Sequence, residues 1–504
     1  MPPIILPRRT LHAFRTALKK HLGLKARDDG PPVRVDAAED GGARLTAIAP
    51  DGRGVSLAIP GDRPLGDLVL PFELLADAGA AKSGDVQLSE ADGGEAVVAS
   101  WDERGMPRSA RGTLEKADRG RAAKFDVPAV EAFRDPGPGF AAALRQAVAV
   151  TDAESTRDAL GCVRLDPHAG RIEATDSHCL LIARGFTFGF EEPVLLPAPH
   201  ALGRSPLKDA EVRIARVTDG PKVPLVVLSA GDWTLWAPEA RDARFPDLDR
   251  VVPSQHGKTT VSLSEADAAF LLDRIASLPG AGDGRKPVTL EAKDNKFLIR
   301  AAEEGGTPVE LVTASSQVRG TAICVADRRF VARALATGCR KIVLNGPEEP
   351  VRCDAAGDGR PGTTLVFATL AGDPVPAKDA VRLTGEAPAS AAPAAAVTPA
   401  KRPATPMPAN RLNGSPADPA PTNGHAANGH PANGHAANGH AANGHPAAAD
   451  SEALLDRATA LQATLADAAA EAKGLAADLR KLKRRDRLVS SALGSLKRLG
   501  SLTA

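Results

Sequence analysis

The sequence has few cysteines and almost no net charge. Its 504 residues include five cysteines, which lie far apart and form no Cys-x-x-Cys pair. An odd and scattered set of thiols argues against a disulfide framework and fits reduced cysteines in the cytoplasm. The formal net charge is +1. The chain as a whole is therefore not a basic nucleic-acid binder, and local basic patches are what remain to be considered.

Long apolar runs are also missing. No stretch approaches 18 apolar residues, so we predict no transmembrane segment and no membrane partner. The N-terminus, MPPIILPRRTLHAF, places its charges after a short apolar run. A signal peptide has the opposite order. We therefore expect a cytoplasmic protein.

Sequence motifs of common enzymes are absent as well. There is no HExxH and no GxSxG, and GAGDGRK at Gly280 to Lys286 lacks the spacing of a Walker A loop. One stretch, TDSHC at Thr175 to Cys179, places nucleophile and base types side by side, which keeps a hydrolase as an alternative. Adjacent strand residues point to opposite faces, so we expect Ser177 and His178 not to share a proton. The sequence therefore predicts a protein that is not an enzyme and has no cofactor.

What is present is one plan in three copies. Residues 162–197 contain alternating apolar and polar runs, a turn at Gly170 and a final apolar run closed by Pro197, a pattern typical of half-buried strands. The same order occurs at 33–78 and 288–335, and an amphipathic helix precedes each copy. A spacing of roughly 125 residues is that of domains. The pattern predicts an α+β fold with like domains at 1–125, 126–254 and 255–372.

The rest of the chain differs in composition. Residues 373–450 are mostly Ala, Pro, Asn, Gly and His, with NGH repeated every five residues, which predicts a disordered linker. Its histidines lack the preformed geometry of a metal site, so we predict none. Residues 451–504 carry apolar residues seven apart from Leu454 to Leu496. That spacing predicts a coiled-coil helix.

Two segments resemble a known family. ATDSHCLLIA at 174–183 resembles the ATDGHRLA of the bacterial sliding clamp, the beta subunit of DNA polymerase III, and RFPDLDRVVP at 244–253 is similar to its FPDYRRVLP loop. STRDALGCVRL at 155–165 and VLLPA at 194–198 also agree. The resemblance covers roughly residues 5–372, with the first copy matching by architecture alone. It implies three tandem sliding-clamp-like domains that form half of a ring.

The resemblance also implies a function. Two clamp chains close head to tail around duplex DNA and hold a polymerase on its template by topology. This chain is thus expected to be a homodimeric processivity factor in DNA replication, with duplex DNA, DNA polymerase III subunits and the clamp loader as partners and further association through the coiled coil. The alternative is a clamp-derived scaffold, an interaction protein that no longer closes on DNA.

Basic residues on two predicted helices would then face DNA phosphates. For residues 8–23 the other interpretation is a solvated surface helix. The helix that leads the third copy departs from the pattern, because Glu265, Asp267 and Asp273 outnumber Arg274. The predicted DNA-facing residues are Arg9, Arg15, Lys19, Lys20, Arg329 and Arg333.

The family binds short partner peptides in an apolar cleft between its second and third domains. Ser177 stands where the family has Gly, Cys179 where it has Arg, and Leu248 where it has Tyr. The chain end that normally borders the cleft continues here into a long tail, so the choice of partners is in question more than the fold. By resemblance the cleft comprises Leu160, Thr175, Ser177, His178, Cys179, Leu180, Pro246, Arg250, Val251, Phe367 and Thr369.

Overall fold

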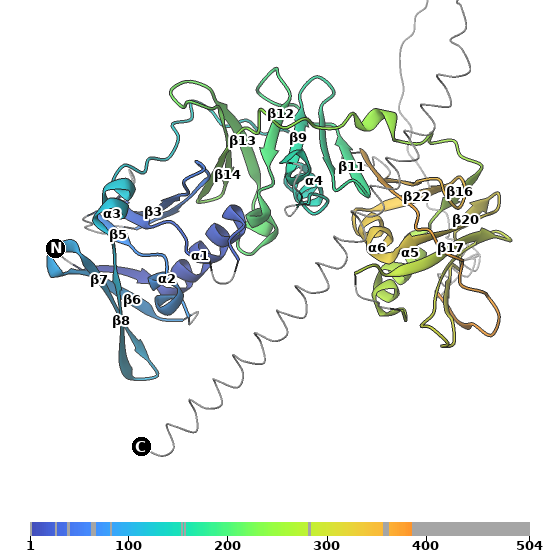
Figure 1. The fold of residues 1–504 in the computed structure, drawn as a ribbon, viewed down its shortest axis with the longest axis horizontal. Helices are drawn as coiled ribbons and strands as arrows, with labels where there is room; N and C mark the ends of the chain where they lie inside the picture. The colour runs from blue at the N-terminus through green and yellow to red at the C-terminus, as the bar shows by residue number, and fades with distance from the viewer. Residues whose placement is uncertain are drawn as a thin grey trace, which may run out of the picture. The chain divides into compact units, whose positions relative to one another are not determined.

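The computed structural model describes most of the chain up to residue 385 (Figure 1). The described residues are 3–25, 28–37, 41–61, 67–80, 83–152, 155, 158–280, 284–355 and 362–385. They belong to one compact unit. The predicted coiled coil and most of the predicted linker lie outside the described residues.

Each repeat contains two runs of antiparallel strands and its own helices. The first repeat consists of β1 (Ile4–Pro7), α1 (Arg8–Leu22), β2 (Val33–Ala37), β3 (Ala43–Ile48), β4 (Gly54–Ile59), β5 (Leu68–Leu70), α2 (Leu74–Ala78), β6 (Asp85–Ala91), β7 (Ala96–Glu103) and β8 (Met106–Thr113). A short helix, α3 (Lys116–Ala122), follows it.

The second repeat contains α4 (Phe140–Val148), β9 (Cys162–Asp166), β10 (Arg171–Thr175), β11 (Cys179–Arg184), β12 (Val194–Pro197), β13 (Val212–Val217), β14 (Leu225–Ala230) and β15 (Trp233–Pro238). Helix α4 lies against β9, β10 and β11 (Figure 1). β9 and β10 form an antiparallel hairpin, which confirms the strands and turn that the sequence predicts around Gly170.

The third repeat contains β16 (Thr259–Ser262), α5 (Glu265–Arg274), β17 (Pro287–Lys293), β18 (Lys296–Ala301), β19 (Val309–Val312), β20 (Gln317–Arg319), β21 (Ala322–Asp327), α6 (Arg328–Ala336), β22 (Cys339–Leu344), β23 (Val351–Ala355), β24 (Gly362–Phe367) and β25 (Val381–Thr384). No helix among the described segments of the chain combines the length and apolar composition needed to cross a membrane.

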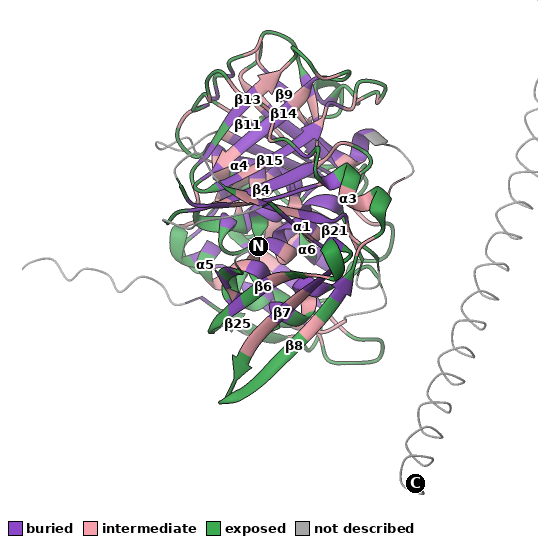
Figure 2. Ribbon diagram, turned by 90° about the vertical axis from the view of Figure 1, so that its left-hand side faces the viewer, coloured by how far each residue is buried: buried purple, intermediate pink, exposed green. Residues whose placement is uncertain are grey.

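Four sheets organise these strands. Their orders are β1-β6-β7-β8, β13-β14-β15-β4-β3-β2-β5, β12-β9-β10-β11-β24-β23-β22-β16-β20 and β21-β17-β18-β19-β25. The seven-stranded sheet joins the first and second repeats through β15 and β4, and the nine-stranded sheet joins the second and third through β11 and β24. The inner faces of the strands are buried, as the purple segments of Figure 2 show.

Helix α1 shows how the sequence pattern becomes packing. Its apolar stripe, Leu11, Phe14, Leu18 and Leu22, is buried as predicted. The helix follows Pro7 and ends at Gly23, whose φ of 70° is a left-handed conformation that glycine adopts without a steric penalty. Phe14 stacks on Trp233 of the second repeat with ring centroids 6.1 Å apart. The helix thus contributes to the core across the junction between two repeats.

The predicted end of the ordered domains at residue 372 is wrong. The strand β25 lies inside the segment expected to be linker, and it pairs in parallel with β19. Its four residues, VRLT, alternate in hydropathy but are too few to stand out beside Ala- and Pro-rich sequence. The third repeat therefore extends to at least Gly385.

A buried histidine on α1 predicts how stability depends on pH. His21 Nε2 donates to the Trp236 carbonyl at 2.9 Å, and burial lowers the pKa of His21 to about 4. Since the folded pKa lies below the ordinary 6.5, the unfolded chain binds the proton first. Above pH 6.5 His21 is neutral in both states, so its contribution to stability is fully present. As pH falls to 4, we expect the free energy of unfolding to decrease by up to roughly 3 kcal/mol.

Urea unfolding of the wild type and His21→Gln between pH 7 and 4 measures this contribution. The glutamine retains a donor for the Trp236 carbonyl but does not titrate, so the free energy of unfolding should fall less steeply in the variant. An equal pH dependence of the free energy of unfolding in the two proteins would show that His21 does not cause the loss of stability.

Candidate functional site

A polar pocket lies where the second and third repeats meet. It has a volume of about 550 Å³ and is lined on one side by Leu160, Asp176, Ser177 and His178 and on the other by Arg285, Asp327, Arg329, Phe330, Arg333 and Leu370, with Thr151, Asp152 and Ser155 at its margin. Three of the predicted cleft residues, Leu160, Ser177 and His178, are therefore brought together here.

The turn between β10 and β11 forms the wall from the second repeat. Asp176 Oδ1 accepts hydrogen bonds from the backbone amides of His178 and Cys179, at 2.9 and 2.6 Å. Thr175 Oγ1 donates to the Cys179 carbonyl at 2.9 Å and accepts from the Ser177 amide. Ser177 has a φ of 73°, a left-handed conformation that disfavours side chains. This explains why a glycine is suited to the position and shows that the serine is held there by the turn.

The turn also bears on the hydrolase interpretation. Ser177 Oγ and His178 Nδ1 lie 3.3 Å apart, so the expectation that these neighbours could not reach each other is wrong, because they sit in a turn and not on a strand. Asp176 is committed to the backbone amides. Burial raises the pKa of Cys179 to about 12, so its thiol stays protonated at neutral pH and is a poor nucleophile.

The wall from the third repeat comes from α6. Arg329 forms an ion pair with Asp327 at 2.6 Å. The guanidinium of Arg333 lies 5.9 Å from the centroid of the Phe330 ring, and Phe330 stacks on Phe367 with centroids 5.9 Å apart. Arg329 and Arg333, which the sequence analysis predicts to face DNA, line this pocket as well, a position that the analysis did not predict. The face of α6 that meets the turn depends on the pairing of β11 with β24, which no local pattern reveals.

Four further cleft residues lie near the junction of β11 and β24. Phe367 pairs with Cys179 across the junction, and the Ala368 amide donates to the His178 carbonyl at 2.8 Å. Thr175, Cys179 and Phe367 are buried, while Thr369 is partly exposed. None of these four residues lines the pocket itself.

A second surface lies on the opposite face of β11. Leu180 and Ile182 alternate with the core residues of that strand and form a separate buried cluster with Leu248 and Val366. Phe245 and Val252 pack against the cluster. Leu180 therefore lies beneath the loop of residues 244–253, on the other side of the sheet from Cys179.

The outer side of that loop is open. Val251 is 54% exposed, Pro246 is exposed, and Arg250 pairs with Asp247 at 2.9 Å on the surface. Leu248, which replaces the family's tyrosine, is buried. The predicted cleft residues thus lie on both faces of β11, around one end of the strand.

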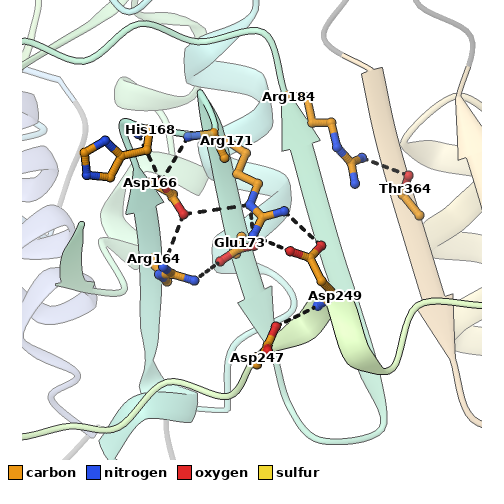
Figure 3. A network of polar contacts seen from close by, with 10 residues as sticks. Arg164, Asp166, His168, Arg171, Glu173, Arg184, Asp247, Asp249 and Thr364 are labelled. Atoms are coloured by element: carbon orange, nitrogen blue, oxygen red, sulfur yellow. Dashed lines mark hydrogen bonds and ion pairs between the residues drawn. The ribbon is translucent and has the colours of Figure 1, made fainter. Parts of the chain in front are cut away.

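An ion-pair network fixes the loop to the second repeat (Figure 3). Both guanidinium amines of Arg171 donate to Asp249, each at 2.9 Å. Arg171 also pairs with the fully buried Glu173 at 2.7 Å, and Arg164 pairs with Glu173 at 2.9 Å. Burial raises the pKa of Glu173, whereas the hydrogen bond from Arg171 lowers that of Asp249. The bidentate contact therefore joins a charged loop residue to a charged strand residue.

The predicted DNA-facing residues of α1 differ in exposure. Arg9 and Lys20 are exposed, and Arg15 and Lys19 are partly buried. The guanidinium of Arg15 lies 5.5 Å from the centroid of the Phe72 ring. Lys19 and Lys20 occupy the last turn of the helix, where positive charge also interacts favourably with the helix dipole. Arg9 and Lys20 are thus the more exposed charges among these four.

One of the acidic residues of α5, Asp267, has a structural role, whereas Glu265 and Asp273 are exposed. Asp267 is fully buried and accepts hydrogen bonds from the Ala314 and Ser315 amides, both at 2.8 Å, and from Ser316 Oγ at 2.6 Å. Burial alone would raise its pKa, but these hydrogen bonds lower it. Asp267 thus holds a turn in place and does not contribute to a surface potential.

Comparison with known proteins identifies the fold. No family model matches the chain, and no curated protein matches it. Several solved structures match the chain. Two of them are the DNA polymerase sliding clamp from Bacillus subtilis and the DNA polymerase III beta subunit from Thermotoga maritima, each with a TM-score of 0.56 and 17% identity. Each match covers 74% of this chain and 100% of the solved chain. The Helicobacter pylori beta clamp bound to a DNA ligase peptide (TM-score 0.53, 15% identity) is covered completely by 73%. The chain has the fold of the bacterial sliding clamps, and the resemblance read from residues 174–183 and 244–253 is confirmed at that level.

The bidentate contact predicts the behaviour of the loop. Asp249→Asn should lower the free energy of unfolding by at most about 1 kcal/mol, because Asp249 is largely exposed, and should speed amide hydrogen exchange in residues 244–253. Asp242→Asn, at an exposed position before the loop, is the control. Matching exchange rates in the two variants would contradict the assigned role of Arg171 and Asp249.

Proposed function

We propose that this chain is a DNA sliding clamp of the DNA polymerase III beta type, a non-enzymatic processivity factor whose homodimer encircles duplex DNA. The observation that carries the proposal is the match of the three-repeat fold to the whole length of solved clamps. Continuous sheets at both junctions support it further, because a closed ring needs rigid joints between its segments.

The proposed DNA-facing residues lie on α1 and α6. Arg9, Arg15, Lys19 and Lys20 lie on α1, and Arg329 and Arg333 lie on α6. A sliding clamp must be attracted to phosphates without recognising a sequence, and scattered basic side chains provide that attraction. The near-zero net charge is consistent with a local contact of this kind.

The proposed partner-binding surface lies around the end of β11. We assign it to the exposed loop residues Pro246, Arg250 and Val251 together with the pocket at Leu160, Ser177 and His178. A cytoplasmic clamp would receive DNA polymerase III subunits and the clamp loader there. Residues 451–504 are proposed to associate with further copies or partners as a coiled coil.

Topological retention tests the clamp function directly. The full chain, incubated with a clamp loader and ATP on nicked circular DNA, should co-elute with the circle and be released when a restriction enzyme linearises it, because a ring slides off free ends. Retention that does not depend on DNA topology, or no retention at all, would favour the clamp-derived scaffold.

A second experiment tests the partner surface. Val251→Glu places a charge at the exposed rim and should weaken binding of a clamp-binding peptide at least about tenfold, roughly 1.4 kcal/mol. The DNA ligase peptide bound by the Helicobacter pylori clamp is a suitable fluorescent probe for anisotropy. Val223→Glu is the matched control, since Val223 is also exposed (40%) but lies before β14. Equal affinity of both variants for the peptide would remove the assignment.

A further inference from the structure

The three repeats use one rule to join their sheets. The orders β5-β2-β3-β4, β12-β9-β10-β11 and β21-β17-β18-β19 are equivalent, with antiparallel pairing throughout. Hence β4, β11 and β19 are the same strand of three copies. The last strands of the second runs, β8, β15 and β24, are equivalent in the same way. Each repeat therefore has two strands that can form a junction: the last strand of its first run and the last strand of its second run.

Both internal junctions pair one edge of each kind. β4 pairs antiparallel with β15 of the next repeat, with Leu57 opposite Trp233. β11 pairs antiparallel with β24 of the next repeat, with Leu181 opposite Leu365. By the same rule, β19 of the third repeat would pair with β8 of a further first repeat, which a second copy of this chain would supply.

The two strands left over are in different states. Among the described strands, β8 pairs with β7 alone, and most of its residues are exposed, as its green ribbon in Figure 2 shows. The edge of β19 is instead occupied by β25, in a parallel register from Val309 opposite Val381 to Val312 opposite Thr384. The chain itself therefore covers the edge that its own junction rule assigns to a second copy.

Specific contacts hold this segment in place. Arg382 donates to the fully buried Glu310 at 2.8 Å, and Arg300 pairs with the same carboxylate at 2.6 Å. The segment before β25 is also fixed, since the Val375 carbonyl accepts from Arg300 and its amide donates to Thr289, both at 2.7 Å. Residues 375–385 thus follow a defined path over β17, β18 and β19.

Apolar packing contributes little to that path. All four residues of β25 are exposed, with Val381 at 53% and Leu383 at 42%. The strand is held by backbone hydrogen bonds and by one ion pair, so a competing strand can replace it. β8 is suited to do so because it carries Arg108 and Arg111 and no acidic residue, and an arginine is what Glu310 of β19 binds in β25. Each of these arginines now forms an exposed ion pair, with Glu103 and Asp92 respectively, which pairing with β19 would have to exchange for Glu310.

We propose that β25 is a built-in competitor for the chain's self-association surface, which is the edge of β19, and that β8 of a second copy is the partner it excludes. Two chains close only when residues 381–384 leave β19. That the partner strand is β8 of a second copy rests on the proposed clamp function. That β25 occupies the edge of β19 does not.

Charge reversal at the ion pair tests the proposal in the full chain. Arg382→Glu should drive residues 381–385 off Glu310, raise their amide hydrogen exchange, and lower the dissociation constant for self-association at least about tenfold in sedimentation velocity without DNA. Lys378→Glu makes the same charge change at an exposed position of the same segment and should match the wild type. The combined variant Val381→Gly, Arg382→Ser, Leu383→Gly and Thr384→Ser removes both the ion pair and the strand propensity, and should associate at least as tightly as Arg382→Glu.

Three results would overturn the proposal. The first is an unchanged dissociation constant in the combined variant despite fast exchange at 381–385. The second is a wild-type dimer in which residues 381–385 stay protected. The third is a dimer lost in Arg382→Glu, which would mean that β25 is exchanged between copies. The circular-DNA experiment separates the two ideas: association without topological retention refutes the clamp function alone, and retention with β25 still protected refutes this inference alone.

Discussion

The unsatisfied edge of a β-sheet is the constraint on which this structure depends. An edge strand exposes a row of amide and carbonyl groups that must meet water or another strand. Here β4 meets β15 and β11 meets β24, so the sheets run through both junctions. The positions of the candidate sites follow from these pairings. The pocket at Ser177 and His178 exists because β11 brings its turn next to the end of β24.

Polar residues around the site hold the loops and turns that the strand pairing brings together. Arg171, Glu173 and Asp249 tie the loop after β15 to β10 (Figure 3), and Asp267 secures the turn after β19. Asp267 accepts from backbone amides, whereas Arg171, Glu173 and Asp249 hold one another through their side chains. In the same way, the carboxylate of Asp176 accepts hydrogen bonds from two backbone amides and so holds the turn at the site.

Local patterns predicted what is local. Alternation along β9, β10 and β11 and the stripe on α1 identified the strands, the helix and their buried faces, and the segments at 174–183 and 244–253 led to the clamp fold. Positions that depend on pairing between distant strands could not be predicted from local patterns. The position of Arg329 and Arg333 beside His178 depends on the junction of β11 with β24, and β25 depends on contacts with Glu310 some 70 residues away. The contact of Ser177 with His178 was missed because a left-handed turn breaks the strand rule.

The continuity of the sheets has a consequence for how the chain unfolds. Phe14 of α1 packs on Trp233 of the second repeat, and six residue pairs connect β11 to β24. Loss of one repeat would remove core partners and hydrogen bonds from the next. We therefore expect neighbouring repeats to stabilise one another, so that unfolding of one lowers the free energy of unfolding of the next.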